Sequence, residues 1–214
     1  MIKKLLLGLI LTTVIVGCNG ESTAEKMYEH LEETVEMEQG FFELQDPYME
    51  LEEEEQEIYN EIIELTAEDM EKIESLAANA IENIEERKSL LDDEEQSIQE
   101  AEAAFGEVKS LVEELDEEAK SLAESMIDTM ENRYETYYEL NEATHNSLNE
   151  DKQLYQMFMD EELTEEELRE KINTINESYD HVMELNQQFN DLTNEYNDLK
   201  EQFYKQSDLN VVYE

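Results

Sequence analysis

The chain has 214 residues and carries 60 acidic side chains against 14 Lys and Arg, a formal net charge of −46. Such a surface repels nucleic acid and anionic lipid headgroups, so the composition argues against binding to DNA or RNA. One proline and five glycines are few turn-forming residues for this length, and 39% hydrophobic residues are enough for a core. Long helices are therefore expected, and an all-β fold is not.

The N-terminus has the organisation of an export signal. Lys3 and Lys4 precede an apolar run, residues 5–16, which is shorter than the roughly 20 residues of a membrane-spanning helix. The run ends in Ile-Val-Gly-Cys, residues 15–18, which resembles the bacterial lipobox. We therefore predict a lipoprotein signal peptide over residues 1–17, cleavage between Gly17 and Cys18, and a diacylglycerol on the Cys18 thiol.

A lone cysteine cannot form an internal disulfide, so an exported chain is expected to use it for something else. The alternative is a free or buried thiol beside an uncleaved anchor. Acylation would place the protein on the outer face of the cytoplasmic membrane, facing the cell wall, with residues 18–24 as lipidated Cys and flexible tether. Asn19, in place of an aspartate, does not suggest retention at an inner membrane and fits a Gram-positive host.

The remaining chain predicts a helical bundle over residues 25–207 and a tail over 208–214. The first helix is expected at about 25–64 and to be kinked or broken at Pro47, because proline disrupts a helix interior. One form of this break ends the first piece near Gly40. The helix would then restart with Asp46 as its cap and Pro47 in the first helical position.

The second helix, about 67–113, shows the clearest repeat. Seven apolar residues recur at a spacing of seven, which indicates coiled-coil-like packing: Met70, Ala77, Ile84, Leu91, Ile98, Phe105 and Val112. Five of the seven partner positions in the second row are apolar as well, and the exceptions are Arg87 and Glu94. The pattern passes Gly106 without a change of phase, so we place that glycine inside the helix.

The third and fourth helices are predicted at about 116–159 and 164–206. Asp116 is an acceptable helix start, because acidic residues suit the positive end of the helix dipole, and Thr164 with Glu167 forms a capping box. The third helix carries an irregular inward row, and the fourth carries heptads. Short connections then predict an all-α, elongated, up-and-down four-helix bundle about 60 Å long.

The sequence offers little for chemistry. Glu142 and His145 form one Glu-x-x-His pair of the kind that holds metal in bundles, but no second pair occurs. No calcium-binding loop and no nucleophile motif are present, so we expect no cofactor, no metal site, no catalytic residues and no enzymatic activity. Tyr134 and Tyr137 fall on the predicted core row, which favours packing over stacking on sugars.

Several stretches resemble the YkyA-like cell-wall-binding lipoprotein family of Gram-positive bacteria. They cover most of the chain: "NIEERKSLL" at 83–91, "MENRYETYYEL" at 130–140, "DKQLYQMF" at 151–158, "LTEEELREKIN" at 163–173 and "FYKQSDLNVVYE" at 203–214. The resemblance implies an extended four-helix fold and a place at the cell envelope, with no catalytic motif. The extreme acidity of this chain departs from the pattern of that family, whose members are usually richer in lysine.

We therefore expect a membrane-anchored, non-enzymatic envelope lipoprotein that acts as a cell-wall-associated binding or spacer module. Its partners would be the membrane, through the lipid on Cys18, and peptidoglycan or another envelope protein. One alternative is an acidic surface that binds divalent cations. A wall-acting hydrolase is a further alternative.

Overall fold

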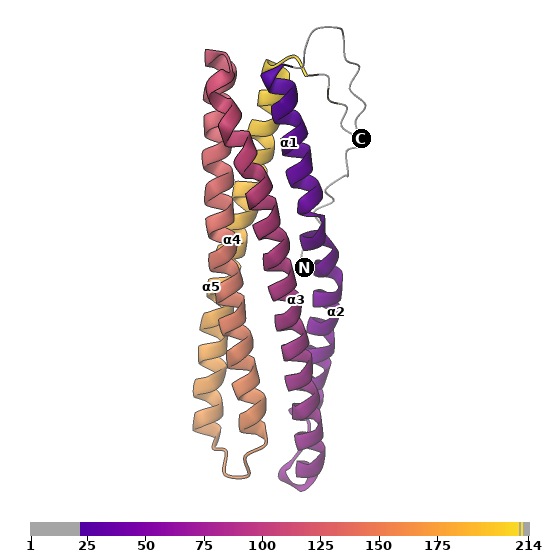
Figure 1. The fold of residues 1–214 in the computed structure, drawn as a ribbon. Coiled ribbons are helices and arrows are strands. Elements are labelled where there is room, and N and C mark those ends of the chain that lie inside the picture. The colour runs from indigo at the N-terminus through magenta and orange to yellow at the C-terminus, as the bar shows by residue number, and fades with distance from the viewer. Residues whose placement is uncertain (1–21, 210, 212–214) are drawn as a thin grey trace.

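The computed structural model describes residues 22–209 and 211, and these residues form a rod of long helices (Figure 1). In chain order the helices are α1 (Thr23–Met37), α2 (Gln39–Ile62), α3 (Met70–Leu111), α4 (Glu117–Phe158) and α5 (Glu165–Gln206), with 3-10 turns η1 (Ala67–Asp69) and η2 (Val112–Glu114). No strand occurs in this part of the chain. The predicted all-α, up-and-down order is confirmed, with α1 and α2 together as the first of four antiparallel rods. Gly17 and Cys18 lie outside the described residues.

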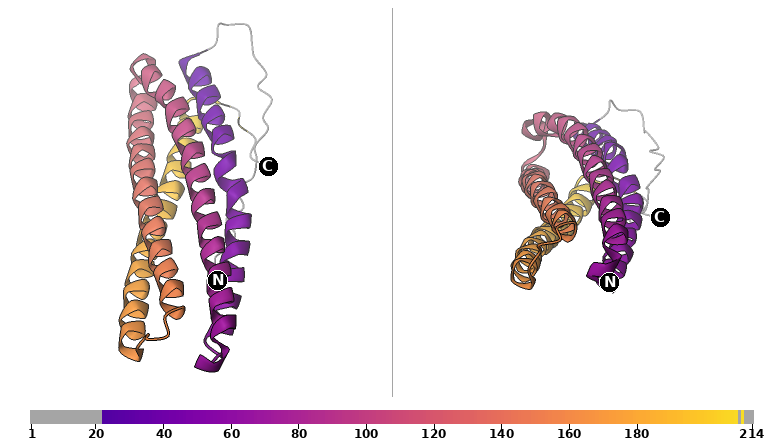
Figure 2. Two further views of the ribbon diagram at one scale, coloured as in Figure 1. Left: turned by 60° about the horizontal axis from the view of Figure 1, so that its bottom comes forward. Right: turned by 90° about the horizontal axis from the view of Figure 1, so that it is seen from below.

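Each rod packs against the rod that precedes or follows it in the chain. Helix α3 contacts α1, α2 and α4, and α4 contacts α5. Helices α3, α4 and α5 have 42 residues each, so the bundle is about 63 Å long. Figures 1 and 2 show that α5 crosses α4 and approaches α1 only with its C-terminal part. There the rings of Tyr28 and Tyr204 lie 5.2 Å apart.

The helix starts follow from local sequence. Ser22 and Thr164 each accept a hydrogen bond from a backbone N–H three residues on, and the glutamates at those positions bond back to the cap. The reversal between α3 and α4 occupies residues 112–116, where the Asp116 side chain accepts from the N–H groups of Glu118 and Ala119. Strong caps thus mark turns that contain neither glycine nor proline.

The core has two parts. One lies in the half of the rod that holds both ends of the described chain, and its large side chains include Met27, Leu31, Phe105, Met126, Phe189 and Phe203. The other lies in the half that holds the α2–α3 and α4–α5 turns, which we call the distal half. Its buried apolar set is smaller: Ile62, Ala77, Ala80, Ile84, Leu91, Leu148 and Tyr155. Polar side chains complete the packing there.

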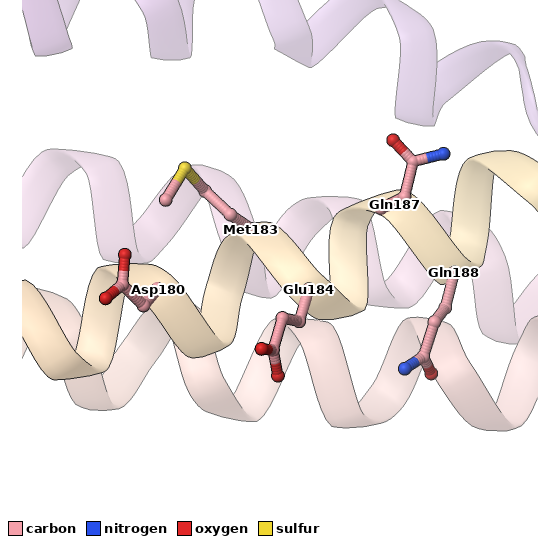
Figure 3. A pocket seen from close by; sticks show the side chains of 5 residues that line it. All are labelled: Asp180, Met183, Glu184, Gln187 and Gln188. Carbon is pink, nitrogen blue, oxygen red and sulfur yellow. The ribbon is translucent and has the colours of Figure 1, made fainter.

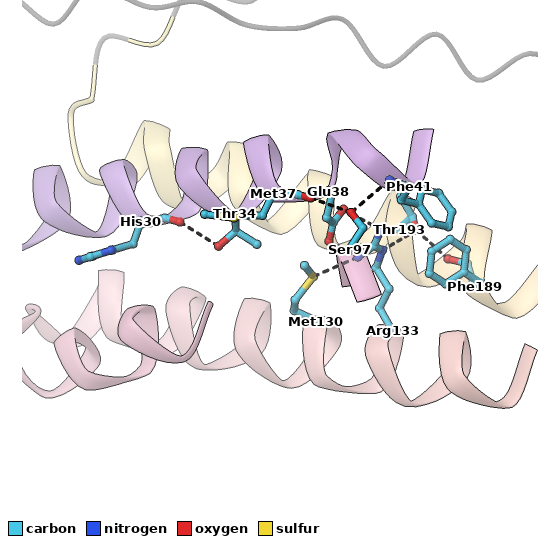
Figure 4. A network of polar contacts seen from close by, with 10 residues as sticks. All are labelled: His30, Thr34, Met37, Glu38, Phe41, Ser97, Met130, Arg133, Phe189 and Thr193. Atoms are coloured by element: carbon cyan, nitrogen blue, oxygen red, sulfur yellow. Dashed lines mark hydrogen bonds and ion pairs between the residues drawn. The ribbon is translucent and has the colours of Figure 1, made fainter. Parts of the chain in front are cut away.

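The position predicted for the break in the first helix is wrong. The helix bends at Glu38, between α1 and α2, and Pro47 lies inside α2. At the bend, the Ser97 hydroxyl on α3 donates to the carbonyl of Met37 (2.8 Å) and accepts from the N–H of Phe41 (3.2 Å), which replaces helical bonds (Figure 4). Directly after Pro47, side chains of α3 donate to the Tyr48 hydroxyl and the Leu51 carbonyl. These contacts hold α2 against α3 despite the proline.

Candidate functional site: buried polar networks along the rod

The predicted lipid attachment site, Gly17–Cys18, is not tested by the described residues and stays a prediction. The first described residue, Ser22, caps α1 at one end of the rod. That end also holds the α3–α4 turn and the end of α5, since Thr23 Oγ1 lies 3.5 Å from Glu114 and Gln206 donates to Glu118 (2.7 Å). The α2–α3 and α4–α5 turns lie at the opposite end (Figure 1).

A buried ion pair fixes the bend between α1 and α2. Arg133 on α4 donates through Nη1 and Nη2 to the two carboxylate oxygens of Glu38, at 2.7 and 3.0 Å. Its Nε donates to the Thr193 hydroxyl on α5 (2.9 Å), and its guanidinium lies 4.6 Å from the centre of the Phe189 ring. Arg133 and Glu38 are only 2% and 7% exposed. The pair therefore joins the bend, α4 and α5 at a single point inside the rod (Figure 4).

A second network crosses the distal half. Arg87 on α3 forms an ion pair with Glu55 on α2 and donates to the Tyr48 hydroxyl (3.1 Å). On the other side, the Tyr179 hydroxyl on α5 donates to Asp151 on α4 (2.7 Å), and Arg87 acts electrostatically on both. Arg87 thus stands between an acidic side chain of α2 and one of α4, and the network links all four rods.

Glu94 lies seven residues after Arg87, about two turns along α3, and is 7% exposed. Gln45 donates to its carboxylate (2.7 Å), and Tyr137 forms a second hydrogen bond with it. Burial raises the pKa of Glu94 to about 7. Burial likewise raises the pKa of Glu55 to about 7, although the neighbouring Arg87 acts in the opposite direction. These carboxyl groups therefore change charge in the neutral range.

The other candidates from the sequence do not form a site. Among the described residues, no three His, Cys, Asp or Glu side chains gather in a way that could hold a metal ion. His145 faces Asp92, with Nε2 and Oδ1 3.4 Å apart. Tyr134 and Tyr137 are 2% and 1% exposed, so their rings are not available to stack on a sugar. They fill the core, as their position in the sequence predicts.

The surface of the rod also offers no clear candidate for a binding site among the described residues. One depression of about 580 Å³ lies on α5 and is lined by Asp180, Met183, Glu184, Gln187 and Gln188. All five side chains come from this single helix and spread along its surface (Figure 3). None of the lining residues comes from another helix, so the depression is open and does not enclose a ligand. None of the helices in the described ranges is both long and apolar enough to cross a bilayer.

Sequence reasoning missed the buried ion pairs. Arg87 and Glu94 did give a signal, because both occupy core positions of the α3 heptad repeat. Arg133 and Glu38 gave none, because an isolated arginine beside Tyr134 does not reveal a partner 95 residues earlier.

These features define a class of protein: an elongated helical rod with its described chain ends at one end and charged side chains inside. The family model described as "Putative cell-wall binding lipoprotein", YkyA, matches residues 22–206. The chain belongs to this family. It is 30% identical over 192 residues to the uncharacterized lipoprotein YkyA of Bacillus subtilis strain 168, covering 89% of this chain and 86% of the relative.

The fold is also similar to a solved structure. A conserved protein of unknown function from Staphylococcus aureus, determined by crystallography at 1.6 Å, superposes with a TM-score of 0.61 and 13% sequence identity. The similarity covers 87% of this chain and 98% of that one. At this identity the comparison supports the fold alone.

Proposed function

We propose that this protein is a lipid-anchored, non-enzymatic rod of the cell envelope, attached through Cys18 to the outer face of the cytoplasmic membrane. The observation that carries the proposal is the Ile-Val-Gly-Cys sequence, residues 15–18, four residues before the cap of α1 at Ser22. Four residues span at most about 14 Å, so the anchor would keep one end of the bundle at the membrane. Membership of a lipoprotein family supports the lipid anchor.

The rod would then stand with its distal half directed at the cell wall. Its helices reach about 63 Å from the anchored end, and the α2–α3 and α4–α5 turns would be the parts that meet wall material. In this arrangement the protein acts as a spacer or binding module, with peptidoglycan or another envelope protein as its partner. The family description, "Putative cell-wall binding lipoprotein", supports a wall ligand.

Two measurements test the proposal. Mass spectrometry of the protein isolated from membranes is expected to show loss of residues 1–17 and a diacylglycerol on Cys18, and an intact leader or an unmodified sulphur would contradict the anchor. Sedimentation with purified peptidoglycan, with and without teichoic acid, tests the wall partner. Retention on stripped peptidoglycan would indicate the glycan–peptide network as ligand, whereas no retention on either material would leave a spacer.

A divalent-cation-binding surface is the second candidate, and the charge excess favours it. Titration calorimetry with Mg²⁺ or Ca²⁺ separates the two possibilities. Saturation at a defined stoichiometry would indicate cation sites, and a smooth, non-saturating heat would indicate screening alone.

A further inference from the structure

The distal half of the rod, together with the adjoining mid-rod layer that contains Glu94, buries more acidic side chains than basic ones. Glu55, Glu94 and Asp151 are 9%, 7% and 5% exposed, on three different helices. In this part of the described chain, Arg87 is the one positively charged residue that is buried as a whole. The side chain of Lys171 is also only 10% exposed, but it pairs with Glu150. Burying an ionised carboxylate without a paired cation is costly, so three ionised carboxylates around one guanidinium are not a stable core. This charge imbalance does not depend on the proposed function.

The surroundings of Glu94 suit both charge states of a carboxyl group. On the α2 side, Glu94 faces the Gln45 amide and interacts electrostatically with Tyr48. On the α4 side, it faces the Tyr137 hydroxyl. An amide and a phenol can each donate to a carboxylate or accept from a carboxylic acid. Neither neighbour carries a charge that would hold Glu94 ionised.

Glu55 and Asp151 share Arg87 from opposite sides. Arg87 on α3 pairs directly with Glu55, which also bonds to Tyr155 on α4 and lies near Glu52 on its own helix. Asp151 receives the bond of Tyr179 from α5. Lys171 on α5 and Glu150 on α4 also act on Asp151, but these two form their own ion pair. One guanidinium cannot fully neutralise both carboxylates.

We propose that the buried carboxyl groups of Glu55, Glu94 and Asp151 bind protons as the pH falls, and that this proton binding tightens α2 and α5 onto α3 and α4. Protonation removes buried negative charge and adds one O–H donor to each group. At Glu94 one oxygen can still accept a hydrogen bond while the new O–H donates to the other partner, and at Asp151 the bond with Tyr179 can reverse. Ionisation above neutral pH leaves the charge uncompensated, and the helices open locally. In the other half, the buried Glu38 carboxylate is matched by the Arg133 guanidinium.

The pKa values of these carboxyl groups are shifted in the direction that the proposal requires. Burial raises the pKa values of Glu55 and Glu94 to about 7 and also raises that of Asp151. A carboxyl group whose pKa is higher in the folded than in the unfolded chain binds more protons when folded. For Glu55 and Glu94 the contribution to stability is therefore complete below the unfolded value of about 4.3 and is lost as the pH rises from there through 7.

The test compares the full-length protein in detergent with two variants, from pH 5 to 8 in 1 M NaCl, where screening suppresses repulsion between exposed acids. Glu94→Gln mimics the protonated form. Glu86→Gln removes the same charge from an exposed position on α3 and is the matched control. The wild type and Glu86→Gln should melt at lower temperature as the pH rises. Glu94→Gln should show a shallower pH slope, so that its melting temperature gains on that of the wild type by about 5 °C between pH 5 and pH 8.

Hydrogen exchange locates the effect. After correction for intrinsic rates, amides of α2 and of the first half of α5 should exchange faster at pH 8 than at pH 6, and those of α1 should not. An unchanged pH slope in Glu94→Gln, or a melting temperature below the wild type at pH 8, would overturn the proposal. So would saturable tightening at pH 8 by 1 mM CaCl₂, which would indicate a metal ion as the ligand.

A second measurement needs no variant. Side-chain ¹³C NMR of the wild type should show carboxyl groups that titrate between pH 6 and 8, well above the range of exposed acids. If every carboxyl group titrates below pH 5.5, the proposal is wrong even if Glu94→Gln fails to fold.

Discussion

A methyl group added to Gly40 would lie 2.8 Å from Oγ and 3.2 Å from Cβ of Ser97, so the backbone at the bend and α3 meet at a distance that only glycine permits. The same Ser97 hydroxyl bonds to Met37 and Phe41 on either side of the bend. We expect Gly40→Ala to force the start of α2 away from α3 and to lower the free energy of unfolding by about 1–3 kcal/mol. Denaturant unfolding followed by circular dichroism measures this change.

Gly106 provides the matched control, because it also lies inside a helix but has nothing within 4 Å of an added Cβ. Gly106→Ala should raise the free energy of unfolding by about 0.5–1 kcal/mol, the usual gain from replacing a helical glycine. Opposite signs for the two substitutions are the expected result. A stabilising Gly40→Ala would show that the bend and α3 do not meet closely.

The ion pair between Arg133 and Glu38 should respond asymmetrically to mutation. Arg133→Met leaves the Glu38 carboxylate buried without its partner, and we expect a loss of about 3–5 kcal/mol. The double variant Glu38→Met with Arg133→Met removes both charges and should recover most of that loss. Thermal unfolding of both variants gives the comparison.

Arg169→Met is the control for charge removal alone. Arg169 pairs with Glu165 one helical turn away at 2.6 Å, and its side chain is 71% exposed. Exposed pairs of this kind contribute little, so its melting temperature should stay near that of the wild type. Equal losses in Arg133→Met and the double variant would mean that packing, and not charge pairing, is what Arg133 contributes.

The architecture could be predicted because its determinants are local. The row that begins at Met70 put Ala77, Ile84 and Phe105 at a seven-residue spacing, and all three are buried. The up-and-down order follows from short connections between such helices. The heptad phase also placed Arg87 and Glu94 in the interior, which is where they lie.

The bend and the ion pairs could not be predicted, because they depend on partners far away in sequence. Ser97 lies 60 residues after the carbonyl that it binds, and Arg133 lies 95 residues after Glu38. A proline is a strong local signal, so the break was expected at Pro47. The bonds that α3 makes to Tyr48 and Leu51 outweigh that signal. Cys18 remains predicted by local sequence alone.

The buried tyrosines predict how the protein unfolds in alkali. Burial raises the pKa values of Tyr134, Tyr137, Tyr155, Tyr196 and Tyr204 above the usual value near 10. Their folded pKa exceeds the unfolded one, so their contribution to stability is complete below pH 10 and is lost as the pH rises beyond it.

We therefore expect these side chains to ionise together with unfolding above pH 10. The absorbance of tyrosinate at 295 nm and the helical signal at 222 nm should change in one transition. Tyr137→Phe, which keeps the ring but cannot ionise, should move that transition to higher pH. If the tyrosines titrate fully while the helical signal is intact, the hydroxyls are not held in the core as the structure has them.

Like charges on the helix surfaces predict that added salt stabilises the rod. Exposed acids stand one helical turn apart in pairs such as Glu50 with Glu54 and Glu166 with Glu170, and 60 acids face only 14 Lys and Arg. Each like-charge pair one turn apart costs about 0.2–0.5 kcal/mol, and salt screens this repulsion. The melting temperature should therefore rise between 10 mM and 1 M NaCl at constant pH.

A titration with MgCl₂ at the same ionic strength distinguishes screening from bound cations. An additional rise that saturates requires bound Mg²⁺, whereas coincident curves require screening alone. A melting temperature that does not change across both titrations would show that surface repulsion does not limit the stability of this fold.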